Sequence, residues 1–235
     1  MSSGRSATMH WLGRGALALS VSLCMGSAFA EMTVIRAEGS AAANTSASVY
    51  FNAGVNDRSI SSLLSALSDI SVKYPGTQNV NLYINSTGGS MEAGYVAYEF
   101  LRRYPLKVNA INAATTDSAA TMLYCAAPER YSEPLSRFLL HPAAVGISMN
   151  GYLKPDQARQ AVEDAEQENL KFSDIYKDCL KLPSNDITTL LSSESNRRRL
   201  DYAAAKSLGL ITQQLDQLPR TPDRAIYFIT DGTSR

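Results

Sequence analysis

The chain has 235 residues, which suits one α/β domain of generous size, and its 45% hydrophobic content excludes a disordered tail protein. Basic and acidic residues both number 22, so the chain lacks the positive charge of a non-specific nucleic-acid binder, and no nucleic-acid partner is expected. Two histidines and three cysteines are too few for a dedicated zinc or iron–sulfur protein, and no cofactor or metal is expected.

Residues 1–30 have the layout of a secretory signal peptide. Arg5 and Arg14 form a positive region without acidic residues, residues 15–29 are small and apolar, and Ala28-Phe29-Ala30 is an A-x-A cleavage site. The apolar stretch is shorter than the roughly 20 residues that a spanning helix needs, which argues against an uncleaved anchor. We therefore expect cleavage after Ala30 and a periplasmic or secreted protein.

Cleavage would change the residues available for chemistry. The mature chain would keep 20 basic and 22 acidic residues, one histidine (His141) and two cysteines (Cys125 and Cys179). A single histidine cannot build a multi-histidine metal site, so His141 is the one imidazole available for proton transfer. Export permits a disulfide between the two cysteines, but Cys125 lies in an apolar run, which favours two buried thiols.

The mature chain alternates between strands and helices. Residues 31–47 are rich in Ala, Ser and Thr and are expected to be flexible, ahead of a folded domain over residues 48–235. A helix should start at a cap on Asn56 or Asp57, and another should run to about Arg103. A third helix is expected over residues 118–127. Strands are expected over residues 48–52, 80–85, 107–112 and 137–141. This alternation predicts βαβ units with a mostly parallel sheet.

The C-terminal third should be mainly helical. A long helix is predicted over residues 155–182, with Pro155 in its first turn and Pro183 after its end. One side of it is apolar, so it could pack against a neighbouring subunit or simply cover the surface. A short helix capped by Asp201 should stop at Gly209, and residues 226–230 should form an edge strand.

Three loops at the carboxyl ends of predicted strands carry residues suited to acyl transfer. Ser118 stands at a strand-to-helix junction, where it can cap the helix or act as a nucleophile beside free backbone N–H groups. The Gly88-Gly89 turn could present a further N–H at the same point. His141 ends a hydrophobic strand and could be the general base or a core histidine.

These motifs resemble those of ClpP, the proteolytic subunit of Clp protease. Residues 82–90 (LYINSTGGS) are similar to the family's Y-I-N-S-P-G-G-S, and residues 117–123 (DSAATML) resemble its nucleophile motif. Residues 130–142 resemble the strand that leads to the family's histidine, and residues 208–211 (LGLI) resemble its terminal motif. The resemblance implies an α/β fold of the ClpP/crotonase type, with stacked βαβ units and a projecting handle helix.

The resemblance also implies roles for individual residues. Ser118 would be the nucleophile and His141 the general base, while Gly89 and Ala119 would donate the oxyanion-hole N–H groups. The handle joins subunit rings in the family, which implies a homo-oligomer acting on peptides or unfolded proteins. Because the periplasm has no ATP, no ATPase partner is expected.

The sequence departs from the family pattern at three places. Asp117 replaces a small residue and could place a charge beside His141 or obstruct the site. The segment between Ser118 and His141 is shorter than in the family. This shortening is closer to exported relatives of signal-peptide peptidase A, which use a Ser–Lys dyad, with Lys171 as the candidate lysine. Asn196 matches the position of the third triad residue, and Glu194 is the fallback.

The sequence therefore predicts an exported serine peptidase that works through an acyl-enzyme on Ser118. Asp117 and the missing aspartate leave open a degenerate member that binds peptides or a partner protein. A Ser–Lys peptidase is a further alternative. A crotonase-like enzyme for acyl thioesters fits poorly, because coenzyme A thioesters are cytoplasmic.

Overall fold

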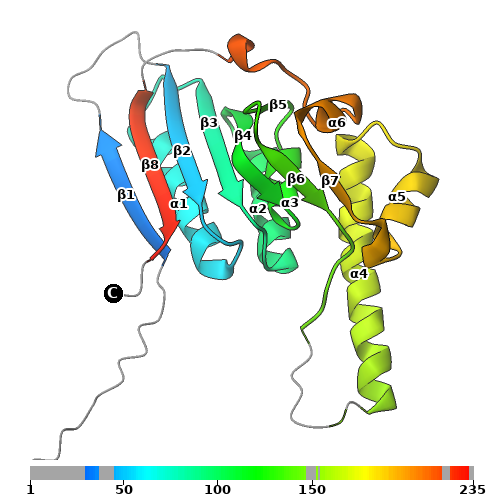
Figure 1. Cartoon of the computed structure of the whole chain (residues 1–235). Helices are drawn as coiled ribbons and strands as arrows, with labels where there is room; N and C mark the ends of the chain where they lie inside the picture. The colour runs from blue at the N-terminus through cyan, green and yellow to red at the C-terminus, as the bar shows by residue number, and fades with distance from the viewer. Residues whose placement is uncertain (1–29, 37–44, 147–151, 153, 219–222, 233–235) are drawn as a thin grey trace, which may run out of the picture.

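The strands of the chain form one mixed sheet in the computed structural model, which describes residues 30–36, 45–146, 152, 154–218 and 223–232. The strand order is β1-β8-β2-β3-β4-β6-β7, and β5 pairs with β4 (Figure 1). The strands are β1 (Ala30–Arg36), β2 (Ser46–Asn52), β3 (Asn79–Ser86), β4 (Lys107–Asp117), β5 (Glu129–Ser132), β6 (Arg137–Leu140), β7 (Arg198–Leu200) and β8 (Asp223–Asp231). The predicted signal peptide lies outside the described residues except for Ala30.

The helices pack on one face and at one end of this sheet. They are α1 (Asp57–Lys73), α2 (Met91–Arg103), α3 (Ala120–Cys125), α4 (Pro155–Cys179), α5 (Ser184–Leu191) and α6 (Tyr202–Ser207), with short 3₁₀ turns η1 (Glu194–Asn196) and η2 (Leu215–Gln217). In Figure 1, α1, α2 and α3 lie behind the sheet, and α4 stands beside β7. Among the described residues, no helix is both long and apolar enough to cross a membrane.

The centre of the fold is the predicted set of βαβ units. Strands β2, β3 and β4 pair in parallel, and α1 and α2 connect them. Side chains such as Val49, Leu82 and Ala110 are fully buried between the strands and the helices. The Asn56 side chain caps α1 by accepting the N–H groups of Arg58 and Ser59, so the cap is Asn56 rather than the predicted alternative, Asp57. The α/β fold class is confirmed.

The N-terminal segment differs from its prediction. Residues 31–47 were expected to be flexible, but residues 30–36 form β1 and residues 46–47 begin β2. Strand β1 pairs antiparallel with β8, and β8 pairs in parallel with β2. The final strand is therefore internal, and β1 takes the edge position that the sequence assigned to residues 226–230. Burial of Tyr227 and Ile229 in the core holds β8 there.

Strand β4 also runs further than predicted. The predicted strand stops at residue 112, but residues 113–117 continue it to Asp117. The cause is a new partner: the end of β4 pairs with β6, with Thr115 opposite Arg137 and Asp117 opposite Leu139. This extension delivers Ser118 to the end of a strand that is held from both sides.

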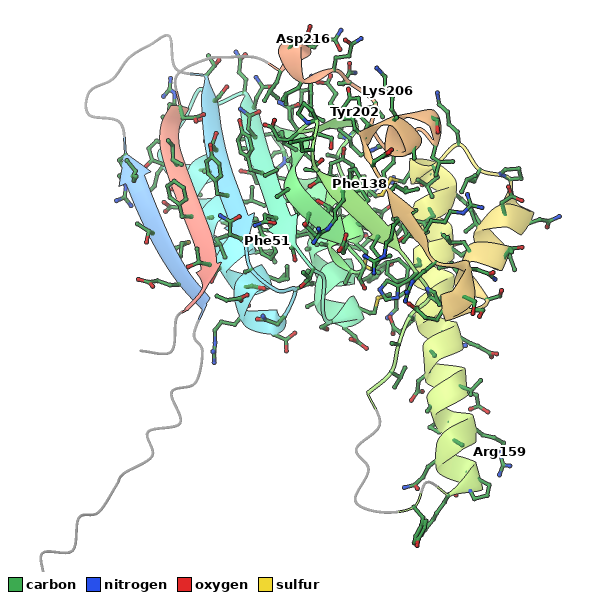
Figure 2. All side chains as sticks on the ribbon, in the orientation of Figure 1. Phe51, Phe138, Arg159, Tyr202, Lys206 and Asp216 are labelled. Atoms are coloured by element: carbon green, nitrogen blue, oxygen red, sulfur yellow. A yellow bond between two sulfur atoms is a disulfide. The ribbon has the colours of Figure 1, made fainter. Side chains whose placement is uncertain are left out.

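Helix α4 is the projecting helix that the resemblance implies. Its 25 residues span about 37 Å at 1.5 Å per residue. Only its C-terminal part is buried, through Phe172, Ile175, Tyr176 and Cys179. The remainder extends past the sheet, with Arg159 near its far end (Figure 2). It ends at Cys179, three residues before the predicted end.

The buried base of α4 is fastened to α3 and α6. Cys125 and Cys179 form a disulfide, so the expectation of two free thiols is wrong. The Arg130 guanidinium is buried and donates to the carbonyl oxygens of Ala127, Cys179, Gly209 and Leu210. These carbonyls stand at helix ends, which carry partial negative charge, and they balance a guanidinium that has no carboxylate partner among the described residues.

Removing the disulfide should destabilise the fold. The bridge closes a loop with a sequence separation of 54, so a Cys125→Ala/Cys179→Ala variant should lose about 2–4 kcal/mol of unfolding free energy. Urea unfolding with and without dithiothreitol measures this loss. The reductant should lower the midpoint of the parent protein and leave that of the double variant unchanged. If the urea midpoint of the parent protein is the same with and without dithiothreitol, the bridge does not form in solution.

Candidate active site

Ser118 occupies a sharp turn between β4 and α3. Its φ of 54° is in the left-handed region, and Ser118 is the one described non-glycine residue with positive φ. Such backbone costs roughly 1–3 kcal/mol and tends to occur at functional sites. The backbone N–H of Ser118 donates to Leu139 O at 2.9 Å, which holds the turn against β6. The N-cap of α3 is Ala119, without a side-chain cap bond, so Ser118 does not cap this helix.

The Gly88-Gly89 turn packs directly against Ser118. A Cβ atom on Gly88 would lie 2.6 Å from Ser118 Cβ and 2.9 Å from Ala119 N, and Gly88 has a φ of 87°. The turn is fixed from its other side by Val55, whose N–H donates to Gly88 O and whose carbonyl accepts from Ser90 N, both at 2.8 Å. The sequence did not indicate that Val55 holds this turn. The one available signal was its position directly before Asn56, the residue that caps α1.

Two backbone N–H groups are left free beside Ser118. Gly88 O accepts from Val55 N, and because Gly88 C=O and Gly89 N–H share one trans peptide unit, the Gly89 N–H points away from Val55. Neither Gly89 N nor Ala119 N has a hydrogen-bond acceptor among the described residues. Free, fixed N–H donors at one point are the components of an oxyanion hole. The structure thus brings together Ser118, Gly89 and Ala119.

His141 follows β6, which pairs with the end of β4 just before Ser118. Its ring is 19% exposed, and His141 Nδ1 lies 3.5 Å from Glu194 Oε2. A hydrogen bond from Arg197 lowers the pKa of the Glu194 carboxyl, and the charge of His141 lowers it further, so Glu194 is ionised at neutral pH. No hydrogen bond joins Ser118 to His141 in the described residues; such contacts are often long before a substrate binds.

Asn196 is not the residue that contacts His141. Its side-chain amide donates to Thr189 O at 2.8 Å and to Ser192 Oγ at 3.1 Å, which caps the end of α5. Glu194 and Asn196 share the single 3₁₀ turn η1, where residues two apart point in different directions. The prediction of Asn196 beside the imidazole is therefore corrected in favour of the fallback, Glu194.

Asp117 adds a buried carboxyl group to the site. It is 8% exposed, and its Oδ1 has no hydrogen-bond partner among the described residues. Burial raises the pKa of Asp117, while the charges of Arg137, Arg199 and His141 oppose that rise. Asp117 therefore places a carboxyl group within electrostatic range of the imidazole, as the sequence suggested.

Lys171 serves another part of the surface. Its Nζ lies 2.6 Å from Glu168 Oε1 and 5.7 Å from the centre of the Tyr95 ring. These residues line a groove between α2 and α4, and no contact joins Lys171 to Ser118. In the described residues there is also no group of three or more His, Cys, Asp or Glu side chains arranged for a metal ion.

Comparison with known proteins identifies the family of the chain. The Clp protease family profile matches residues 22–217. The chain belongs to the Clp protease family. It is 30% identical over 105 residues to ATP-dependent Clp protease proteolytic subunit 1 of Chlamydia caviae, covering 44% of this chain and 54% of that protein. It is 37% identical over 70 residues to proteolytic subunit 2 of Pseudomonas aeruginosa, covering 29% of this chain and 35% of that protein.

A solved structure supports the same fold. A ClpP1 mutant from Listeria monocytogenes superimposes with a TM-score of 0.60 at 16% identity, covering 72% of this chain and 90% of that one. This likeness establishes the Clp protease fold. In sequence, the chain spans about half the length of the first curated relatives it matches.

The close approach of the glycine turn predicts a sharp steric effect. Gly88→Ala should lower turnover by about 10²-fold, because the new Cβ would push Ser118 and Ala119 out of place, as if an oxyanion donor were lost. Gly54→Ala is the matched control, since a Cβ there meets Gly88 O at an ordinary 3.7 Å. Peptidase assays on both variants measure this difference. Equal turnover in the two variants would contradict the close packing of Gly88 against Ser118 and Ala119.

The third member of the site can be identified by its effect on turnover. Glu194→Gln should reduce turnover by about tenfold, because the ionised Glu194 carboxylate lies 3.5 Å from His141 Nδ1 and stabilises the imidazolium that forms during the reaction. Asn196→Ala is the control and should leave turnover close to that of the parent, because the Asn196 amide caps α5. Peptidase assays on both variants measure this difference, and a loss of turnover confined to Asn196→Ala would favour Asn196 as the third member.

Proposed function

We propose that this chain is an exported serine peptidase that hydrolyses peptide bonds through an acyl-enzyme. The observation that carries the proposal is the strained turn at Ser118, with the free N–H groups of Gly89 and Ala119 beside it. Strain of this kind is retained where the surrounding structure uses it, and here it presents a hydroxyl next to two hydrogen-bond donors.

Each residue has a role in the proposed reaction. His141 accepts the Ser118 proton as the hydroxyl oxygen attacks the peptide carbonyl, and the Gly89 and Ala119 N–H groups stabilise the oxyanion. The imidazolium then protonates the leaving amine, which gives the acyl-enzyme. Water, activated by the same imidazole, releases the acid. Glu194, ionised and 3.5 Å from Nδ1, stabilises the imidazolium between these steps.

The surroundings of His141 suit an extended peptide. A groove of about 570 Å³ begins at Pro142 and Ala143, directly after the histidine, and runs between the projecting part of α4 and the segment from Leu191 to Glu194. Its walls include the small apolar residues Ala158, Ala161, Val162 and Ala165. We therefore propose that the substrates are peptides or unfolded proteins whose apolar side chains bind in this groove.

Location and assembly form part of the proposal. The signal-peptide pattern of residues 1–30 and the Cys125–Cys179 disulfide both favour a periplasmic or secreted protein, since disulfides persist in oxidising compartments. The exposed Val162 and Leu170 on α4 favour a homo-oligomer built on this helix. An ATPase partner is not proposed, because the periplasm lacks ATP.

The direct test is labelling of the mature chain with a fluorophosphonate, followed by peptide mapping. Attachment at Ser118 is the expected result. A second candidate, a non-catalytic peptide-binding protein, is favoured by the buried Asp117 carboxyl beside the nucleophile, whose Oδ1 has no hydrogen-bond partner among the described residues. A folded protein that is not labelled between about pH 6 and 9, where an imidazole changes from charged to neutral, would select that candidate.

A further inference from the structure

The carbonyl group of Ser118 is held by two hydrogen bonds from one residue. Thr121 donates its backbone N–H to Ser118 O at 2.9 Å and its Oγ1 hydroxyl to the same oxygen at 2.6 Å. Thr121 is fully buried, so water cannot replace either bond. The peptide group that follows the candidate nucleophile therefore has one fixed orientation.

A tyrosine from the projecting helix completes this contact. Tyr176 OH of α4 lies 2.9 Å from Thr121 Oγ1, and Tyr176 is also fully buried. Because Thr121 uses its single hydroxyl proton on Ser118 O, Tyr176 must be the donor of the second bond. Burial raises the pKa of Tyr176, which keeps it protonated and able to donate. The resulting chain of donors runs from Tyr176 to Thr121 to Ser118 O.

The orientation of that carbonyl decides where an oxyanion donor points. Ser118 C=O and Ala119 N–H belong to the same trans peptide unit, so they point in opposite directions within one plane. Fixing the carbonyl toward Thr121 aims the Ala119 N–H away from the core. We propose that Thr121 and Tyr176 are positioning residues that orient the Ala119 N–H of the oxyanion hole; this inference rests on the proposed function.

The two helices are also joined covalently close to this pair. The disulfide joins Cys125 and Cys179, one turn beyond Thr121 in α3 and Tyr176 in α4. Within α4, the Tyr176 ring stacks on Phe172, with 5.2 Å between ring centres, so the position of the ring does not depend on its hydroxyl group alone. Removal of the Tyr176 hydroxyl alone therefore leaves α4 docked. The same arrangement couples the base of the projecting helix to the oxyanion hole.

The test compares variants that differ by one hydroxyl group. Tyr176→Phe and Thr121→Val should lower kcat by about tenfold, less than the loss of an oxyanion donor itself, with KM changed by less than about twofold. Thr121→Ser keeps the hydroxyl and should restore most of the kcat lost in Thr121→Val. A second readout needs no turnover: the ¹H–¹⁵N amide resonance of Ala119 should shift in the Phe and Val variants and stay near its parent position in the Ser variant.

The outcomes separate this inference from the proposed function. If kcat and the Ala119 resonance both match the parent protein in Tyr176→Phe and Thr121→Val, the two hydroxyls serve only the fold and the inference is overturned. If the parent is never labelled at Ser118 but the Ala119 resonance shifts in both variants, the peptidase proposal fails and the positioning of the N–H stands. Equal loss of kcat in Thr121→Ser and Thr121→Val would also overturn it.

Discussion

Replacing Ser118 by alanine should abolish fluorophosphonate labelling of the mature chain and lower peptide turnover by about 10³-fold or more. The hydroxyl oxygen is the only atom removed, and it forms the covalent bond in the proposed acyl-enzyme. The Gly89 and Ala119 N–H groups remain in place, so some residual catalysis of hydrolysis by water is expected. Labelling is read by mass spectrometry, and turnover with an unfolded protein substrate.

A second serine variant controls for loss of structure. Ser68→Ala removes an exposed hydroxyl that donates to Leu64 O within α1, far from the proposed chemistry in sequence. It should be labelled and active like the parent protein. Ser118 has no side-chain hydrogen bond in the described residues, so its removal should leave the unfolding midpoint close to that of the parent. Labelling that persists in Ser118→Ala would place the nucleophile elsewhere.

The local elements of the fold could be predicted because their signals are local. Helix α1 and its Asn56 cap, strand β3 and helix α2 follow from apolar periodicity and capping within short windows of sequence. The strand pairings at the sheet edge could not be predicted in this way. Strand β1 pairs with β8, and those strands lie at opposite ends of the chain. Only tertiary contact gives residues 30–36 a partner.

The site divides in the same manner. Gly88, Gly89 and Ser118 could be identified from their residue types and from their positions after predicted strands. Glycine permits the positive φ that the turn requires, and sites of α/β proteins form at the carboxyl ends of strands. The neighbour of His141 could not, because the choice between Glu194 and Asn196 depends on which way η1 turns after α5. The disulfide was missed for a related reason: burial of Cys125 is visible in sequence, but its approach to Cys179 depends on how α4 docks.

Exchange of His141 for glutamine should remove most turnover while the protein stays folded. Glutamine keeps a polar side chain at a partly exposed position after β6, so the core is not disturbed, but its amide cannot accept the Ser118 proton. Loss of the general base typically costs as much as loss of the nucleophile, about 10³-fold or more. Circular dichroism and the unfolding midpoint should match the parent.

Lys171→Ala is the matched variant that separates a Ser–His from a Ser–Lys enzyme. The Lys171 ammonium pairs with Glu168 beside Tyr95, so its removal should leave turnover and Ser118 labelling within about twofold of the parent, the scale expected when a surface ion pair is removed. Should His141→Gln keep full activity while Lys171→Ala loses it, the base assigned here would be wrong. The Ser–Lys relatives would then be the better guide to the chemistry.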